Sequence, residues 1–111
     1  MATFSRTSIV LVDFPFTDLS DTRLRPALVL AQATAEDYIL CQITSNAHID
    51  SKAIEISNTD FINGSLRQIS YARPNKIFTG HESLINRRVG ILSEKKTNEI
   101  IDAVVEILKN D

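Results

Sequence analysis

The sequence predicts a mainly β domain: a small, strongly bent β-barrel with one helix at its C-terminal end. Short segments rich in branched apolar residues recur along the chain between polar turn residues, which is typical of strands. Apolar residues recur at helical spacing over one long segment, at the end of the chain. Because strands and helices do not alternate, a parallel sheet is not expected. The length of 111 residues predicts a single domain over residues 1–111.

The first two predicted strands cover residues 8–16 and 25–32. The first strand reads SIVLVDFPF, and a polar loop of Asp, Ser and Thr at residues 17–24 separates it from the second. Pro26 fixes its own φ and favours an extended conformation at the residue before it. We therefore expect Arg25 to stand at the entrance of the second strand.

The third strand, at residues 38–44, is almost continuously apolar and is therefore expected near the centre of the sheet. A polar loop at residues 45–51 leads to a short fourth strand at residues 52–56. A fifth strand is predicted at residues 68–72, and residues 75–78 extend it beyond an intervening proline. The sheet therefore continues well past the middle of the chain.

The last part of the chain combines turns, one strand and the helix. Residues 57–65 contain Asn63-Gly64 and are expected to form turns, and residues 81–86 fit one helical turn. A last strand at residues 87–92 completes a total of five or six. The helix is predicted at residues 94–109, with Ser93 as its N-cap. Its apolar face consists of Ile100, Ile101, Val104, Ile107 and Leu108.

Composition limits the classes of function. The formal net charge of −2 gives no support for nucleic-acid binding by the whole surface, so such a function needs a local basic cluster. The single cysteine, Cys41, excludes an internal disulfide and is expected to be a buried, inert thiol in a reducing compartment. The first residues lack the order of a signal peptide, and no apolar run reaches the ~20 residues of a membrane span. We expect a cytoplasmic protein with no membrane contact.

Polar side chains gather at the predicted strand ends. If the second and third strands are antiparallel neighbours, Arg25 and Thr44 fall at the same end of the sheet. A guanidinium suits a phosphate oxygen, and a threonine hydroxyl donates well to a non-bridging oxygen of a phosphorane-like transition state. An RNA 2′-hydroxyl would then be the nucleophile, no metal would be needed, and a cyclic phosphate would remain on the product. The other polar residues in this group are Arg23, Gln42, Ser45, Ser70 and Arg73.

Other interpretations of the same residues stay open. Arg25 also fits a surface arginine that caps a strand end, and the chain also fits a binding barrel without catalysis. The sequence contains no glycine-rich phosphate loop, no Cys/His cluster with zinc spacing and no nucleophile elbow. We therefore expect no metal and no cofactor.

Five segments occur in a characteristic order: IVLVDFPFTDL, LRPALVL, CQITS, NGSLRQISYARPNKIFT, and RVGILS followed by the helix. In this order and spacing, from about Ile9 to Leu108, the chain resembles the PemK/MazF family of bacterial toxins from type II toxin–antitoxin systems. The resemblance implies an SH3-like barrel with a C-terminal helix, shared with CcdB-type toxins, and usually a homodimer. It also implies a metal-independent, sequence-selective endoribonuclease that cleaves single-stranded mRNA. A cognate antitoxin would inhibit it by covering the RNA groove.

The resemblance also assigns roles to residues. The catalytic arginine of the family falls on Arg25, and its catalytic threonine falls on Thr44. The Ser-x-x-Arg stretch that faces the same groove falls on Ser70 and Arg73, which makes Arg73 an expected phosphate contact. The RNA-binding set is therefore expected to be Arg23, Gln42, Ser45, Ser70 and Arg73.

The chain departs from the family pattern in two places. Most relatives begin the first strand with Gly-Asp, where this chain has Thr7-Ser8, and this difference is expected to affect local packing more than chemistry. The first loop, TDLSDTRL, lacks the glycines common in relatives, so the cut-site preference is not carried over. Two non-catalytic alternatives use the same barrel: a CcdB-like gyrase binder, which does not need the pair of Arg25 and Thr44, and a degenerate nucleic-acid-binding homologue.

Overall fold

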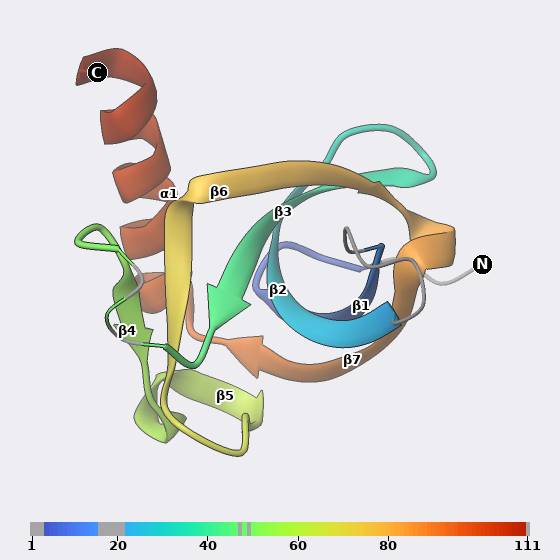
Figure 1. The fold of residues 1–111 in the computed structure, drawn as a ribbon, viewed down its shortest axis with the longest axis horizontal. Coiled ribbons are helices and arrows are strands. Elements are labelled where there is room, and N and C mark those ends of the chain that lie inside the picture. The colour runs from blue at the N-terminus through green and yellow to red at the C-terminus, as the bar shows by residue number, and fades with distance from the viewer. Residues whose placement is uncertain (1–3, 16–21, 47, 49, 111) are drawn as a thin grey trace.

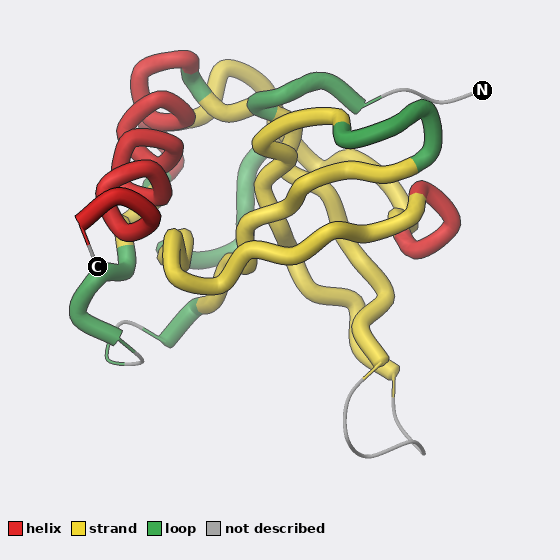
Figure 2. The backbone as a smooth tube through the Cα atoms, turned by 90° about the horizontal axis from the view of Figure 1, so that it is seen from above, coloured by secondary structure: helices red, strands yellow, loops and turns green. Residues whose placement is uncertain are grey.

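The computed structural model describes residues 4–15, 22–46, 48 and 50–110. The strands in these residues are β1 (Ser8–Pro15), β2 (Thr22–Gln32), β3 (Asp37–Thr44), β4 (Ile54–Ile56), β5 (Phe61–Gly64), β6 (Ser70–His81) and β7 (Ile85–Leu92). Two 3₁₀ turns, η1 (Asn58–Asp60) and η2 (Glu82–Leu84), and the helix α1 (Glu94–Asn110) complete the described elements. The strands form one antiparallel sheet in the order β4-β6-β3-β2-β1-β7-β5. The sheet curls round on itself, and α1 lies along one side of it (Figures 1 and 2).

Buried apolar side chains form two clusters, one on each face of the curled sheet, within the described residues. Because side chains alternate along a strand, Leu28 belongs to one cluster and its neighbours Ala27 and Val29 belong to the other. We call the cluster that α1 covers the helix-side core, and the other the second core. The helix-side core consists of Ile9, Leu28, Leu30, Cys41, Ile43, Ile56, Ala72, Leu92, Ile100 and Val104. The second core consists of Val10, Val12, Ala27, Val29, Tyr38, Leu40 and Ile85.

The helix α1 begins where the sequence predicts. The backbone N–H of Lys96 donates to Ser93 Oγ at 3.1 Å, which confirms Ser93 as the N-cap. Thr97, Ile100 and Val104 are its buried residues and follow helical spacing. Within the described part of the chain, no helix is long and apolar enough to cross a membrane.

The strand β2 starts three residues earlier than predicted. Thr22, Arg23 and Leu24 pair with the end of β1, so the last part of the predicted loop is strand. Residues 17–21 of that loop lie outside the described residues. At its other end, β2 reaches Gln32 as predicted.

The strand β5 replaces part of the predicted turn region at residues 57–65. It pairs with β7 at one edge of the sheet. Gly64 has a φ of 72°, and a Cβ there would lie 2.2 Å from the Val89 carbonyl oxygen, so only glycine fits this close approach. The Asn-Gly pair therefore ends a short edge strand instead of joining two strands.

The strand β6 runs through Pro74, so residues 75–78 continue the fifth strand beyond the proline, as expected from the sequence. At this point four residues of β6, residues 73–76, lie opposite the single residue Gln42 of β3. This bulge leaves Pro74 outside the hydrogen-bond ladder, so its missing N–H weakens no strand pairing. The bulge also determines where Arg73 points.

The segment before β1 contains the Thr7-Ser8 departure noted above. Thr7 has a φ of 83°, a left-handed conformation that favours glycine. Its N–H donates to the Val29 carbonyl at 3.3 Å, and its carbonyl accepts from Leu92 N–H at 2.8 Å. The strands β2 and β7 thus hold a β-branched residue in a backbone conformation that favours glycine.

Candidate active site

Arg25 and Thr44 lie on neighbouring strands at the same end of the sheet. β2 and β3 are antiparallel, and their last pair at this end is Ala27 with Gln42. Arg25 and Thr44 each lie two residues beyond that pair and, because side chains alternate, on its face. This face continues the second core, to which Ala27 belongs. The fold therefore brings a guanidinium and a hydroxyl group to one end of the second core.

Arg25 lies inside β2 and not at its first residue. The residues before it pair with β1 alone, and Arg25 itself is opposite Val12 of β1. On the side of β3, however, Arg25 lies beyond the last strand pair. Arg25 is half-buried, and at this point of the sheet its backbone is held by one neighbouring strand.

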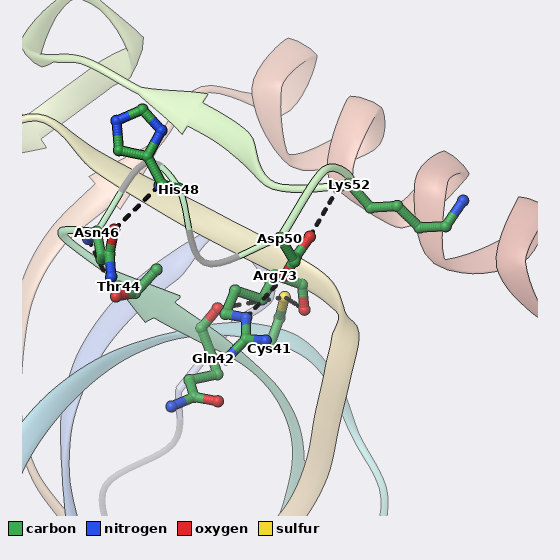
Figure 3. Close-up of polar contacts among 8 residues, drawn as sticks. All are labelled: Cys41, Gln42, Thr44, Asn46, His48, Asp50, Lys52 and Arg73. Carbon is green, nitrogen blue, oxygen red and sulfur yellow. Dashed lines mark hydrogen bonds and ion pairs between the residues drawn. The ribbon is translucent and has the colours of Figure 1, made fainter.

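Thr44 begins a loop that its own side chain shapes. The N–H of Asn46 donates to Thr44 Oγ1 at 3.1 Å, and the N–H of His48 donates to Asn46 Oδ1 at 3.0 Å (Figure 3). Such turns between a side chain and the backbone two residues later fix the path of a loop. Since the Thr44 oxygen acts as acceptor here, its hydroxyl hydrogen remains for donation to a ligand.

Arg73 of β6 is bound to Asp50 of the same loop. Arg73 Nε donates to Asp50 Oδ2 at 2.8 Å, and the two side chains are only 12% and 14% exposed (Figure 3). The backbone N–H of Lys52 donates to the other oxygen, Asp50 Oδ1, at 2.7 Å. Burial raises the pKa of the Asp50 carboxyl, but the hydrogen bond from Arg73, that of Lys52 and the Arg73 charge lower it, and the net pKa is below its ordinary value. The loop is therefore tied at its far end to β6 by an ionised pair.

Cys41 lies behind this ion pair. Its thiol donates to the Arg73 carbonyl at 3.2 Å, and the side chain is fully buried. Burial raises the pKa of the Cys41 thiol to about 12, so the thiol stays protonated. The expected buried thiol is confirmed, and its place next to the Arg73 backbone gives it a part in the bulge of β6.

A family model for PemK-like, MazF-like toxins of type II toxin–antitoxin systems matches residues 5–108. The chain belongs to this family. Both the expected family and the expected barrel with a C-terminal helix are thus confirmed, although the described residues contain seven strands and not five or six.

Solved structures of MazF toxins share this fold. A MazE–MazF structure from Deinococcus radiodurans has 14% identity and a TM-score of 0.78, with 100% of both chains covered. The Mycobacterium tuberculosis toxin MazF-mt6 has 18% identity and a TM-score of 0.71, covering 94% of this chain and 98% of its own. An endoribonuclease from a mycobacterial species, solved with its cognate antitoxin, has 13% identity and a TM-score of 0.69, covering 96% of this chain and 93% of its own. No curated protein sequence matches the chain.

Of the other expected site residues of this PemK/MazF chain, Gln42 lies on the same face as Arg25 and Thr44, whereas Ser70 lies on the opposite face of the sheet. Gln42 is half-buried on the face of Arg25 and Thr44, and in Figure 3 its side chain extends away from the ion pair. Ser45 is exposed at the start of the loop after Thr44. Arg23 lies in β2 opposite Phe14, and its side chain lies outside the described part of the structure.

Ser70 lies on the other face of the sheet. It pairs with Ile56, a member of the helix-side core, and is 4% exposed. Its hydroxyl donates to the Gln68 carbonyl at 3.0 Å. The structure therefore does not bring Ser70 together with Arg25 and Thr44, whereas Arg73 lies on the opposite side of β6 from Ser70, three residues further on.

Asp50 is the residue that the sequence reasoning missed. It lies 23 residues from Arg73, and the pair depends on the bulge of β6, for which the sequence contains no local signal other than Pro74. Because the Asp50 carboxylate neutralises the charge of Arg73, the net positive charge near Arg25 and Thr44 is smaller than the predicted arginines alone would give.

Proposed function

We propose that this toxin is a metal-independent, sequence-selective endoribonuclease that cleaves single-stranded mRNA and is inhibited by a cognate antitoxin. The observation that carries the proposal is the placement of Arg25 and Thr44 on adjacent strands, at one end and on one face of the sheet. The family of the chain supports it, as does the presence of an endoribonuclease among the proteins of this fold.

The chemistry follows from these two groups. The 2′-hydroxyl of the RNA attacks the adjacent phosphorus, and a new P–O bond forms as the bond to the 5′-oxygen breaks. The proton lost from the 2′-hydroxyl balances the proton gained by the leaving 5′-oxygen, so the products are a 2′,3′-cyclic phosphate and a 5′-hydroxyl. Arg25 stabilises the additional negative charge on the phosphoryl oxygens, and Thr44 donates a hydrogen bond to one of them.

The neighbouring polar residues complete the proposed RNA site. Gln42 and Ser45 flank Thr44 and are placed to contact the nucleotides on either side of the cut. Arg23 is proposed to bind another phosphate group of the same RNA molecule, further from the cut. Arg73 is proposed to act in the same site, with its Nε held by Asp50.

The proposal includes two protein partners. The mycobacterial endoribonuclease of this fold was solved in complex with its cognate antitoxin, and the Deinococcus radiodurans structure contains MazE with MazF. Both support an antitoxin partner for this chain. We propose a cytoplasmic homodimer as the active form. Size-exclusion chromatography with light scattering should give twice the chain mass for the toxin alone, and a monomer mass would contradict this part.

The test is RNA cleavage in EDTA by the native protein and by Arg25→Ala. Mass spectrometry should find cyclic phosphate ends with the native protein, and Arg25→Ala should cut at least about 100-fold more slowly. Lys95→Ala, which removes an exposed charge from α1, is the matched control and should cut normally. Intact RNA with the native protein would contradict the proposal, and double-strand DNA breaks on expression would favour the gyrase-binding alternative.

A further inference from the structure

Tyr71 of β6 lies directly opposite Thr44 of β3 in the sheet. On its other side it lies opposite Glu55 of β4, so the three residues form a row across the strands. Directly opposite residues point to the same face, with Cβ atoms about 4.5–5.5 Å apart. Tyr71 therefore lies on the face that carries Thr44 and Arg25, next to the proposed catalytic hydroxyl.

The ring of Tyr71 belongs to neither core. Of the aromatic side chains that the structure describes, Phe4, Tyr38 and Phe78 form or pack against the second core, and Phe61 packs against the helix-side core. Tyr71 is half-buried and is in neither cluster. An aromatic ring that the folded core does not use, at the edge of a phosphate site, is available to a ligand.

We propose that Tyr71 stacks on a nucleobase of the RNA whose phosphate lies at Arg25 and Thr44. The inference rests on the proposed function and adds a base-binding subsite to it. Unpaired bases in single strands expose their π-faces, and aromatic side chains recognise them by stacking. A base lies close to its own phosphate, as Tyr71 lies close to Thr44, so one nucleotide reaches both.

Tyrosine fluorescence provides a direct test of stacking. The chain has no tryptophan and two tyrosines, and Tyr38 is fully buried, so a change in emission on binding reports Tyr71. The probes are single-stranded 2′-O-methyl oligonucleotides of mixed sequence, which lack the free 2′-hydroxyl and are not cleaved. Binding is followed separately by anisotropy of an end label.

The native protein should lose tyrosine emission as the oligonucleotides bind, and Tyr71→Phe should bind them without that loss. Binding without any change in emission, or the same change in Tyr71→Phe, would overturn the stacking inference alone. Absence of binding by the native protein would overturn both this inference and the proposed function.

Kinetics separate stacking from a merely structural role. Tyr71→Ala should raise KM about 10-fold and leave kcat within a factor of two, because stacking binds the substrate and the transition state equally. Tyr71→Phe should keep KM within a factor of two, since the ring remains. Leu108→Ala, at a 70% exposed apolar position of α1, is the control and should leave both constants unchanged.

The outcomes that contradict stacking are equally specific. An unchanged KM in Tyr71→Ala would overturn the stacking inference. The proposed function would still hold in that case, provided that the native protein cleaves RNA. A Phe variant as impaired as the Ala variant would also overturn it, because the hydroxyl and not the ring would then be the group that acts.

Discussion

Arg73 Nε and Asp50 Oδ2 are 2.8 Å apart, and this pair joins the loop after Thr44 to the bulge of β6. The pair is nearly buried, whereas the Arg6–Glu94 pair between the N-terminal segment and α1 has side chains 37% and 63% exposed. Burial makes the first pair costly to break, since an arginine without its partner would remain in a poorly solvated site. The loop beside the proposed catalytic threonine is therefore held by one strong local contact.

Replacing Asp50 should destabilise the protein more than replacing Glu94. Asp50→Asn removes the charge opposite Arg73 and is expected to lower the free energy of unfolding by about 1–3 kcal/mol. Glu94→Gln, in the exposed pair, should lower it by less than about 1 kcal/mol. Urea denaturation of both variants measures this, and equal small losses would show that the Arg73–Asp50 pair is no stronger than a surface pair.

The contribution of Asp50 should depend on pH in a predictable direction. Its pKa in the folded protein is below the ordinary value of 3.8, so its stabilising contribution is fully present above that value. It is lost as the pH falls through the lower folded pKa. The difference in unfolding free energy between the native protein and Asp50→Asn should therefore be constant at pH 5–7 and shrink below pH 3.8. A difference that grows on acidification would contradict the ion pair.

Thr7→Gly should stabilise the protein. Thr7 has a φ of 83°, and a β-branched residue in that conformation carries strain of about 1–2 kcal/mol that glycine does not. We expect a gain of about 0.5–1 kcal/mol after the loss of chain entropy. Thr79→Gly, at an exposed position of β6, is the control and should lose stability. A loss of similar size in both variants would mean that the Thr7 backbone is not strained.

Thr97→Val should also stabilise the protein. Thr97 is fully buried on α1, and its Oγ1 has no hydrogen-bond partner among the described residues. Replacing the hydroxyl by a methyl group of the same shape removes a desolvation cost of about 1 kcal/mol. Thr97→Ser keeps the hydroxyl and loses the methyl group, so it should be less stable than the native protein. A higher thermal midpoint for Ser than for Val would contradict this assignment.

Much of the fold was predictable because local signals and the final structure agree. Branched apolar runs predicted β1, β2 and β3, and Ser93 with the periodic pattern after it predicted α1. The edge strand β5 was missed because its short sequence ends in Asn-Gly, a pair that usually forms turns. The continuation of β6 beyond Pro74 was predicted, but the bulge that removes this proline from the ladder was not.

The candidate site was predictable only where local sequence signals determine it. Arg25 and Thr44 needed only the antiparallel pairing of β2 with β3, which neighbouring strands adopt readily. The face of Ser70 depends on the register of β6 against β4, and that register depends on side chains far away in sequence. The Arg73–Asp50 pair depends on the bulge, and the stacking position of Tyr71 depends on the β3–β6 register. No local pattern encodes these relationships.

The most direct measurement of the central claim, that Arg25 and Thr44 act on one phosphate, is a double-mutant cycle of single-turnover RNA cleavage in EDTA. The variants are Arg25→Ala, Thr44→Val and the double variant, with Thr44→Ser as the control that retains the hydroxyl. Each single loss should slow cleavage by about 100-fold or more, Thr44→Ser should recover most of the rate, and the double variant should be little slower than the worse single variant. A shared site would be contradicted if the fold-losses of the two single variants multiplied in the double variant. It would also be contradicted if Thr44→Val cut RNA at the native rate.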